Sequence, residues 1–379
     1  MVNLIVDLSD ERFDAARTES IRSSLGARGF SLEQLANTRE AALAWIDEEF
    51  GGSWSSEVFA GKSIVAQNAD GFAGFSAYGA CGLKYRWLAA WQDRRDVGIF
   101  GPIGVSRAHR GSPLAAGLLV LALGALRAKG YGFALIPAVG AAALIRFYET
   151  NAGAKVIEEF QPSAWMNRKL RTTVLASGSG TNFQAVLDAA EDPAANLPLE
   201  LTSLVTNNSS AYALERAKRA AVRNQIVVQW ERAVESRQTY DARLLHAVGQ
   251  TQPELLLLLG WMHVLSEQCI LAFPQMLNIH PAFLPHDQER DTVGMPDGVE
   301  IPAFRGAHAI RDAIAQGSPW VGATAHRVTL GTDRGEVLVR KPFAVAPGES
   351  ADSLMDRLRP VEHRVLLGGI RRCVLERKL

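Results

Sequence analysis

From residue 172 onward, short strand-like runs alternate with amphipathic stretches of helical spacing. The strand-like runs are TTVLAS, LTSLVTN, NQIVVQW and ELLLLLGW, and the helical stretches include TNFQAVLDAAED, AYALERAKRAA and RQTYDARLLHAVGQ. Apolar strands connected through helices form parallel sheets that are covered on both faces. The alternation therefore predicts a doubly wound, mostly parallel sheet, which binds ligands beyond the carboxyl ends of its strands.

The length of the chain, 379 residues, exceeds that of one ordinary domain and predicts two. The pattern changes near residue 170 without a linker rich in proline or serine. We therefore expect an N-terminal domain over residues 1–169 and a C-terminal domain over residues 170–379, both of the α/β class.

The N-terminal domain shows a mixture of helices and strands. Residues 11–26 and 32–49 have helical spacing, and SIVAQNADGFAGFSAYG indicates two strands around an Asp-Gly turn. DVGIFGPIGVS and FALIPAV are further strand-like runs, and between them Ser112, Pro113 and Gly130 mark the start and the end of a helix. These segments predict a mixed sheet packed with helices.

Composition excludes several classes of protein. Forty basic residues balance forty acidic ones, so the chain has no broad basic footprint for nucleic acid or for a membrane surface. Cys81, Cys269 and Cys373 are isolated and odd in number, which indicates neither a disulfide framework nor a zinc site, and no metal is expected. No apolar run approaches the ~20 residues that span a bilayer, and the first residues lack the pattern of a secretory signal. We expect a soluble cytoplasmic protein that acts on small molecules, and assembly into a homo-oligomer stays open.

The stretch LNIHPAFLPHD places two polar residues at the end of an apolar run. Side chains two residues apart in a strand share a face, so we expect Asn278 and His280 to point into the same space. An amide beside an imidazole suits acyl transfer, because the amide holds a developing oxyanion while the imidazole stabilises charge or moves a proton. The alternative is a strand-end asparagine and a core histidine whose polar atoms bond to the backbone.

Two further motifs carry chemistry in the same domain. LASGSGTNFQAV is a strand, a glycine-rich turn and a helix start, whose free N–H groups can hold an anion. GATAHRVTLGTDRGEVLV places Asp333 in a loop between two strand-like runs, where a carboxylate can orient or deprotonate another group. Each motif alone has a simpler reading, since Gly-Ser turns open many helices and aspartate is common in turns.

Together and in this order, these motifs resemble the folate-dependent formyltransferases, above all the glycinamide ribonucleotide formyltransferases. The resemblance covers nearly all of residues 172–379. It rests on TTVLASGSGTNFQAVLDA, VTNNSSAYALERAKRAAV, SRQTYDARLL, PELLLLLGWMHVLS, MLNIHPAFLP, HAIRDAIAQG, GATAHRVTLGTDRG and VEHRVLL. It implies a formyltransferase-like variant of the Rossmann fold.

The resemblance also implies a reaction, in which 10-formyltetrahydrofolate supplies a formyl group to the amine of a small acceptor. Asn278, His280 and Asp333 match the catalytic residues of the family. Asn278 and His280 would stabilise the tetrahedral oxyanion. Asp333 would maintain the charge of His280 and help to remove the proton of the amine, directly or through water.

The binding residues carry over in the same way. The folate would lie along the segment GWMHVLS and the loop that ends at Asp333, where His263 stands at a position usually held by a basic residue. The expected folate-binding residues are Met262, Val264, Leu265, Leu330 and Thr332. A phosphate or carboxylate of the acceptor would bind at the glycine-rich turn. The expected acceptor-binding residues are Ser179, Gly180, Thr181, Asn182, Arg237 and His308.

One loop departs from the family. LPHDQERDTVGMPDGVEIPAFRG is much longer than the Leu-Pro-Lys-Tyr-Pro-Gly type that the family shows, and it borders the acceptor site. The longer loop indicates an acceptor other than glycinamide ribonucleotide in a specialised biosynthesis, and the alternative is a solvated surface excursion. A second enzyme alternative is formyltetrahydrofolate hydrolase, in which water is the acceptor. That family carries a small regulatory domain in front, which residues 1–170 do not resemble, and the anion-binding turn would then have no use.

The N-terminal domain resembles the GNAT superfamily of acyl-CoA-dependent N-acyltransferases over roughly residues 52–168, through DVGIFGPIGVS, RAHRGSPLAAGLLVLALGALRAKG and AAALIRFYETNAGAKVI. The resemblance implies acetyl-CoA as the acyl donor. Its pyrophosphate would bind at Arg110, Gly111, Ser112 and Ala115. Pro113 replaces the inner glycine of the family turn and has no N–H to donate.

Tyr148 matches the family tyrosine that protonates the departing thiolate, and the alternative is a ring in the core of an amphipathic helix. Two hypotheses follow for the whole chain. In the first, a bifunctional enzyme acetylates and formylates related small amines. In the second, the N-terminal domain is a non-catalytic module that recruits the acceptor for the formyltransferase.

Overall fold

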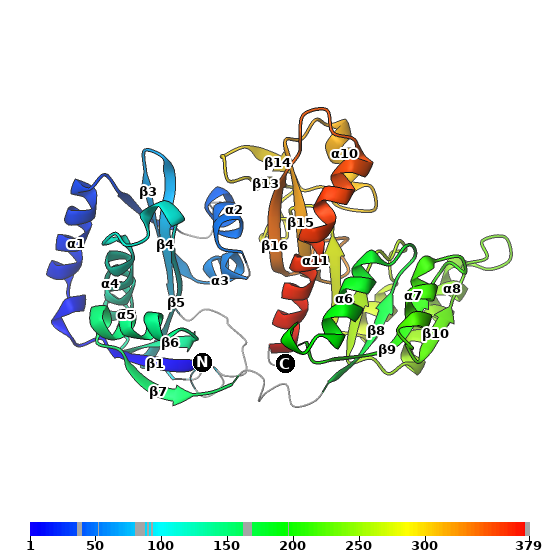
Figure 1. Cartoon of the computed structure of the whole chain (residues 1–379), viewed down its shortest axis with the longest axis horizontal. Helices are drawn as coiled ribbons and strands as arrows, with labels where there is room; N and C mark the ends of the chain where they lie inside the picture. Colours follow the sequence, from blue (N-terminus) through cyan, green and yellow to red (C-terminus); the bar gives the residue numbers. More distant parts are fainter. Residues whose placement is uncertain are drawn as a thin grey trace. The chain divides into compact units, whose positions relative to one another are not determined.

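The computed structural model describes residues 1–35, 40–51, 53–79, 88, 91, 94–161, 169–195 and 197–375 (Figure 1). The chain divides into two compact units. One unit is built on Met1–Trp165 and also includes Gly294–Val299, and the other is built on Met166–Val293 and Glu300–Val374. The two units are described separately below. Cys81 lies outside the described residues.

The N-terminal unit contains a mixed seven-stranded sheet of order β2-β3-β4-β5-β6-β1-β7. The strands are β1 (Val2–Asp7), β2 (Ser31–Leu35), β3 (Lys62–Asn68), β4 (Gly71–Gly79), β5 (Val97–Val105), β6 (Phe133–Val139) and β7 (Lys155–Glu159). The helices are α1 (Ala15–Ala27), α2 (Glu40–Glu49), α3 (Trp54–Ala60), α4 (Leu114–Ala128) and α5 (Ala142–Ala152). All neighbouring strands are antiparallel except β5 and β6, which are parallel and are connected through α4.

Two predictions for this unit need correction. The helix expected over 32–49 begins only at Glu40, because Ser31–Leu35 forms β2 and pairs along its whole length with β3. Leu32 and Leu35 are three residues apart, which gives helical spacing, but the partner strand decides the conformation. β1 is a strand that the predicted elements do not include, and its Leu4 and Val6 are fully buried.

Helix α4 lies at the centre of the N-terminal core. Its residues are apolar almost all round, and most of them are buried against the sheet on one side and against α1 on the other. The paired residues of β5 and β6 cover only Val97–Ile99 and Phe133–Leu135, so the two parallel strands part beyond Ile99.

The C-terminal unit contains a second seven-stranded sheet, of order β10-β9-β8-β11-β12-β15-β16. The strands are β8 (Leu170–Leu175), β9 (Leu199–Thr206), β10 (Asn224–Val227), β11 (Leu255–Leu258), β12 (Met276–His280), β15 (Trp320–Arg327) and β16 (Val337–Ala344). The first five strands in the sheet order are parallel, and β15 and β16 are antiparallel additions at one side. A short hairpin of β13 (Thr292–Gly294) and β14 (Glu300–Pro302) precedes β15.

Helices connect and cover this sheet. They are α6 (Thr181–Glu191), α7 (Tyr212–Arg219), α8 (Arg237–Gln250), α9 (Glu267–Ala272), α10 (Ala309–Ala315) and α11 (Ala351–Leu375). Helix α11 runs close to the sheet because Gly369 has no side chain, and a Cβ there would lie 2.5 Å from that of Ala325. None of the described helices is both long enough and apolar enough to cross a membrane.

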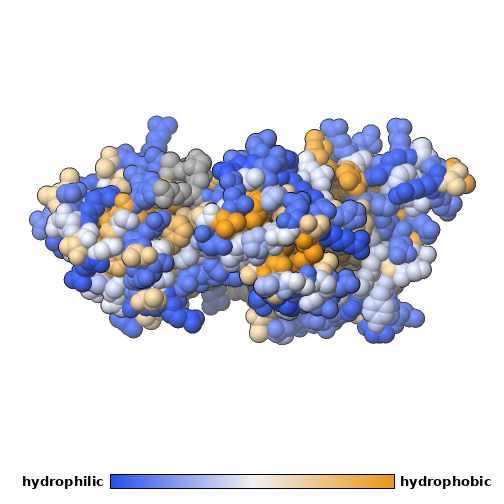
Figure 2. Space-filling model, turned by 90° about the horizontal axis from the view of Figure 1, so that it is seen from above, coloured by the Kyte–Doolittle hydropathy of each residue, from blue (hydrophilic) through white to orange (hydrophobic). Residues whose placement is uncertain are grey.

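The parallel strands bring their carboxyl ends to one edge of the sheet, as the sequence pattern predicts. The glycine-rich turn follows β8, the segment from Gly260 follows β11, and His280 ends β12. The surface seen in Figure 2 is largely hydrophilic, with apolar residues gathered in a few patches. Met262, Val264 and Leu330 are exposed apolar side chains in loops of the C-terminal unit.

Candidate active site

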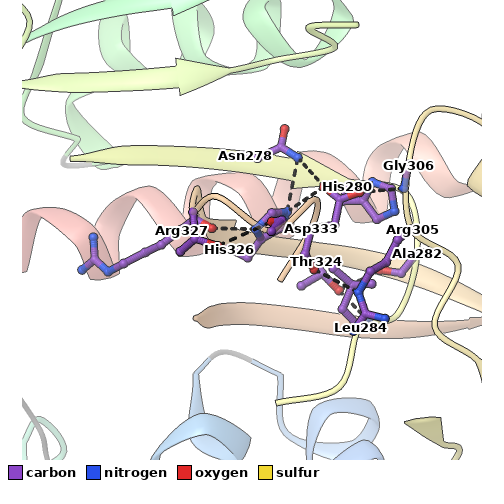
Figure 3. A network of polar contacts seen from close by, with 12 residues as sticks. Asn278, His280, Ala282, Leu284, Arg305, Gly306, Thr324, His326, Arg327 and Asp333 are labelled. Carbon is purple, nitrogen blue, oxygen red and sulfur yellow. Dashed lines mark hydrogen bonds and ion pairs between the residues drawn. The ribbon is translucent and has the colours of Figure 1, made fainter. Parts of the chain in front are cut away.

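Asn278 and His280 lie on the last residues of β12, with Asp333 close to both (Figure 3). The register pairs Asn278 with His326 of β15 and His280 with Thr324. Asp333 belongs to the loop between β15 and β16 and has a φ of 52°, a left-handed conformation that residues other than glycine rarely adopt. The structure thus brings together the three residues that the sequence singles out as catalytic.

The carboxylate of Asp333 is the centre of this group. Its Oδ1 lies 3.4 Å from the Asn278 Nδ2 and 3.4 Å from the His326 Nε2. Its Oδ2 lies 3.6 Å from the His280 Nδ1 and accepts a hydrogen bond of 2.7 Å from the Gly306 N–H. Burial by itself raises the pKa of Asp333, but the contacts with His326, His280 and Gly306 outweigh it and hold the pKa well below its usual range. Asp333 is therefore ionised at neutral pH.

The protonation of His280 follows from its neighbours. Its Nε2 lies 2.7 Å from the carbonyl oxygen of Phe304, and since a carbonyl can only accept, Nε2 carries a hydrogen. The neutral ring then has an unprotonated Nδ1 that faces Asp333. Burial lowers the pKa of His280, and the opposing effect of Asp333 is smaller. Burial favours the neutral ring and Asp333 opposes it, so the expectation that Asp333 maintains the charge of His280 stays a prediction.

His326 is a site residue that the sequence analysis did not single out. Its Nδ1 lies 2.8 Å from the Arg327 carbonyl oxygen, so Nδ1 carries a hydrogen and the Nε2 of the neutral ring is an acceptor. The Asn278 Nδ2 lies 3.2 Å from that Nε2. His326 stands seven residues before Asp333 in GATAHRVTLGTDRG, but its role depends on the pairing of β12 with β15, which no local pattern shows.

These side chains form one wall of a cavity of about 500 Å³ within the C-terminal unit. The expected folate-binding residues all line it, namely Met262, Val264, Leu265, Leu330 and Thr332. Met262, Val264 and Leu330 are 55%, 63% and 60% exposed. Exposed apolar side chains around a concave site are typical of a binding site for a flat, partly apolar ligand.

The glycine-rich turn lines the same cavity. The expected acceptor-binding residues Ser179, Gly180, Thr181 and Asn182 all contribute. Gly180 has a φ of 69°, and a Cβ there would lie 2.9 Å from that of Ala213, so the turn requires glycine. The first N–H groups of α6 follow this turn and have no partner within the helix.

Two observations refine the acceptor end of the cavity. The buried Oδ1 of Asn182 has no hydrogen-bond partner among the residues that the structure describes. Arg216 of α7 donates from its Nε to the Ser179 carbonyl oxygen at 2.8 Å and from its Nη1 to the Gln184 Oε1 at 2.9 Å. Arg216 does not itself line the cavity, but it supports the turn that does and brings a positive charge next to it.

The other two expected acceptor residues do not line this cavity. Arg237 pairs with Asp241 at 2.8 Å, donates to the Val264 carbonyl oxygen and lies over the ring of Trp230. His308 is exposed at the start of α10. The structure thus brings four of the six expected acceptor-binding residues together and leaves Arg237 and His308 outside the group.

Helix α11 contributes a buried acid that the sequence analysis did not name. Glu362 lines the cavity, and Arg359 lies one turn before it on the same wall. Burial raises the pKa of Glu362 to about 7, and the nearby Arg359 opposes this only in part. Glu362 therefore changes its charge near neutral pH within this cavity.

The expected acetyl-CoA residues lie at the start of α4. Gly111 has a φ of 80°, and the Ser112 Oγ accepts a hydrogen bond of 3.3 Å from the Leu114 N–H. Arg110 precedes this turn, and Ala115 is in the first turn of the helix. Pro113 is the residue directly before the helix and donates no N–H.

Tyr148 lies inside the N-terminal core. It is 6% exposed, and its ring centre is 6.1 Å from that of Phe100 and 5.3 Å from that of Phe147. Burial raises the pKa of Tyr148 to about 12, so its hydroxyl keeps the proton that a role as an acid requires. Its ring has the core position that was the alternative reading. In the described part of the chain, no three His, Cys, Asp or Glu side chains are grouped as a metal site would need.

The fold and the site together define an α/β protein with the groups that acyl-type transfer requires. The family model described as formyl transferase matches residues 170–289 and 300–370. The chain therefore belongs to the formyl transferase family, and the prediction of a formyltransferase is confirmed at the level of the family. The match does not include residues 1–169 or 290–299.

Two relatives by sequence agree with this placement. The chain is 28% identical to phosphoribosylglycinamide formyltransferase of Escherichia coli, over 52% of this chain and 83% of that protein. It is 28% identical to the trifunctional purine biosynthetic protein adenosine-3 of Drosophila melanogaster, over 55% of this chain but only 14% of that protein. Among solved structures, glycinamide ribonucleotide transformylase 1 of Symbiobacterium toebii is 33% identical, with 54% of this chain and 86% of that chain covered and a TM-score of 0.46.

Proposed function

We propose that the C-terminal unit transfers a formyl group from 10-formyltetrahydrofolate to the amine of a small anionic acceptor. The observation that carries this proposal is the position of Asn278, His280 and Asp333 on the wall of a cavity that the turn Ser179–Asn182 also lines. Catalytic groups and an anion-binding turn in one cavity suit an acceptor that has an amine at one end and a negative charge at the other.

The residues of the cavity fit the donor. Met262, Val264 and Leu330 offer exposed apolar surface for a flat ring system, and Leu265 adds a buried apolar side chain beside them. When bound there, 10-formyltetrahydrofolate supplies the formyl group. His263 is occupied by a contact of 3.0 Å with the Tyr240 hydroxyl, which supports a structural role in this segment.

Three side chains have different roles in the proposed reaction. The Asn278 amide donates a hydrogen bond to the oxygen that becomes negative when the amine attacks. The His280 Nδ1 is the free base of the site, since its Nε2 hydrogen is held by the Phe304 carbonyl. Asp333 lies 3.6 Å from that Nδ1 and stabilises the imidazolium that forms when His280 takes the proton of the amine.

The acceptor end favours an anion that also carries a hydrogen-bond donor. The N–H groups at the start of α6 and the charge of Arg216 suit a phosphate or a carboxylate. The Asn182 Oδ1 needs a donor, which an N–H or O–H of the acceptor can provide. Water as the acceptor would leave these groups without a use, so we place formyl transfer to an amine ahead of hydrolysis.

Glycinamide ribonucleotide is the first acceptor to test, because several relatives are named phosphoribosylglycinamide formyltransferase and the compound has both the amine and the phosphate. Residues 290–299, which the family model does not match, favour a different amine in a specialised biosynthesis. A panel of phosphorylated and carboxylated amines separates the two. The wild-type chain should release deformylated folate only when the correct amine is present.

For the N-terminal unit we propose an acetyl-CoA-dependent N-acetyltransferase of the GNAT type. Support comes from the parallel strands β5 and β6 that part beyond Ile99, and from the turn at Gly111 that opens α4. The competing proposal is a non-catalytic module that recruits the acceptor. Release of free CoA thiol from acetyl-CoA in the presence of small amines tests the first, and its absence with every amine of the panel favours the second.

A further inference from the structure

The segment Phe304–Gly306 touches the catalytic residues at three points. The Phe304 carbonyl oxygen lies 2.7 Å from the His280 Nε2, and the Gly306 N–H donates to the Asp333 Oδ2 at 2.7 Å. Between them, the Arg305 Nε donates to the backbone carbonyl oxygen of Asp333 at 3.3 Å. One short segment therefore sets the tautomer of His280 and holds both ends of Asp333 (Figure 3).

Arg305 is anchored on its other side by residues that precede it in the chain. Its Nη1 donates to the Asp291 Oδ1 at 3.0 Å, and its Nη2 donates to the Arg290 carbonyl oxygen at 2.8 Å. The Arg305 side chain is only 13% exposed, so each of these contacts satisfies a largely buried guanidinium. The Ala303 N–H also donates to the Asp291 carbonyl oxygen at 2.8 Å, which fixes the two segments together.

Asp291 neutralises two arginines that face each other. The same Oδ1 that accepts from Arg305 also accepts from Arg334, the residue directly after Asp333. Arg334 donates in addition to the Gln288 carbonyl oxygen at 2.7 Å. Without the carboxylate, the positive charges of Arg305 and Arg334 would repel each other across the catalytic loop.

We propose that Arg305 is a positioning residue for the Asp333 loop, and that Asp291 holds it in place by neutralising Arg305 and Arg334 together. The proposal rests on the proposed function, since it concerns the same reaction. Asp333 has a φ of 52°, a conformation that persists only where neighbouring groups enforce it. Arg305 and Gly306 supply this support from one side of the loop, and Arg334 supplies it from the other. Asp291 stands directly after Arg290, the first residue of the segment that the family model does not match.

Loss of the support from Arg305 should displace the carboxylate of Asp333. Arg305→Ala should lower the kcat of formyl transfer from 10-formyltetrahydrofolate to glycinamide ribonucleotide by about tenfold to 100-fold, the loss that a shift of about 1 Å produces. The KM for the donor should stay within about twofold, because Arg305 is not among the residues that line the cavity. Arg305→Lys should recover part of the loss, since one ammonium can replace some of the contacts of the guanidinium but not all.

Two readouts separate positioning from a general loss of folded protein. The first is the acid limb of the kcat profile, which should move to lower pH in Arg305→Ala, because a displaced Asp333 does less to raise the pKa of His280, the proposed base. The second is the amide proton of Gly306 in Asp291→Asn, observed by NMR in the full chain. Its signal should move upfield as the hydrogen bond to Asp333 lengthens.

The matched control is Glu300→Gln, which removes a carboxylate from the same loop. Glu300 pairs with Arg290 and Thr292 at the surface, and it is not among the described residues that form a hydrogen bond or ion pair with Asp333. An Asp291→Asn variant with the Gly306 amide signal of the wild type, or an Arg305→Ala variant with the wild-type acid limb and kcat, would overturn the proposal. If wild type transfers no formyl group to any amine, the proposed function fails, and the amide signal still decides whether Asp291 positions the loop.

Discussion

The Asn278 Nδ2 lies 3.2 Å from the Nε2 of His326, directly opposite it across the pairing of β12 with β15. The His326 Nδ1 is held by the Arg327 carbonyl oxygen, so the other nitrogen of the neutral ring accepts from the amide. This contact fixes which end of the Asn278 side chain is the nitrogen. The amide that is proposed to hold the oxyanion is thus oriented by a neighbouring strand.

We predict that the Asn278 and His326 variants are not additive. Asn278→Ala should lower kcat by about 100-fold to 1,000-fold, the loss of one oxyanion donor. His326→Ala should lower it by about tenfold to 100-fold through misorientation of the amide. Since His326 acts through Asn278, the double variant should resemble Asn278→Ala in a double-mutant cycle of turnover.

The control for this cycle is Asn224→Ala, which removes an asparagine of β10 that donates to the Ser203 Oγ at 3.0 Å. It should keep the turnover of the wild type. Full additivity of the two losses would mean that His326 contributes to the reaction independently of Asn278.

Local patterns were sufficient to predict the catalytic strand and the turn. Asn278 and His280 share a face because they are two residues apart in a strand, and Gly180 precedes a helix start. His326 was missed because its position depends on the pairing of β12 with β15, which brings together residues 48 positions apart in the sequence. A pairing of that range leaves no periodic trace in either segment.

We predict that Arg216, rather than Arg237, governs the affinity for the acceptor, because Arg216 holds the Ser179–Asn182 turn that lines the cavity. Arg216→Ala should raise the KM for the acceptor by about tenfold to 100-fold, the range of one hydrogen bond to a charged group of about 1.5–3 kcal/mol. Arg237→Ala should change it less, because Arg237 is already paired with Asp241 and with the Val264 carbonyl. Lys218→Ala, which removes an exposed cation of the same helix, is the control for a general change of charge. Equal effects of Arg216→Ala and Lys218→Ala would contradict a specific role.

The Arg237 expectation shows what a sequence cannot supply. The residue stands at the start of α8, in a motif that matches the family, and its charge suits an anion. Its side chain is nevertheless satisfied by Asp241 and by two aromatic rings. Which of several arginines turns toward a ligand is decided by such competing contacts, here with residues within about two helical turns of Arg237.

Glu362 should make the stability of the chain depend on pH. Burial raises its pKa from 4.5 to about 7, so the folded chain retains a proton that the unfolded chain has released. Its contribution to stability is therefore complete below the unfolded pKa of 4.5 and is lost as the pH rises through about 7. Glu362→Gln cannot titrate, so its free energy of unfolding relative to wild type should rise between about pH 5 and about pH 8, by at most about 3 kcal/mol.

Urea unfolding at the two pH values measures this difference. Asp352→Asn is the control, because it removes an exposed carboxylate from the first turn of the same helix. A constant difference between Glu362→Gln and wild type across the range would show that Glu362 does not titrate near neutral pH in the folded chain.

The N-terminal unit should bind CoA weakly if it is an acetyltransferase. Pro113 removes one N–H from the turn that opens α4, and a hydrogen bond to a charged group contributes about 1.5–3 kcal/mol. Pro113→Gly should therefore tighten CoA binding, measured by calorimetry, while Tyr148→Phe should slow acyl transfer and leave binding unchanged. Absence of CoA binding by both wild type and Pro113→Gly would make this unit a recruitment module.

The topology of the N-terminal unit explains why its sequence was harder to interpret. β1 is inserted between β6 and β7, so its residues pair with segments far away in the sequence, as between Val2 and Val139. In β2 the local pattern misleads instead, because the spacing of Leu32 and Leu35 is that of a helix. The segment is a strand because it pairs with Ser63 and its neighbours in β3. Tertiary contacts decide both cases.

The most direct test of the central claim is an assay of formyl transfer with the full chain, 10-formyltetrahydrofolate and glycinamide ribonucleotide or another small anionic amine. We predict release of deformylated folate that requires the amine, with at least about 100-fold slower turnover in Asn278→Ala, the loss of one oxyanion donor. His280→Ala and Asp333→Ala should be impaired as well, and their losses should not add. Release that is independent of every amine would indicate transfer to water, and wild-type turnover in the three variants would remove Asn278, His280 and Asp333 from the mechanism.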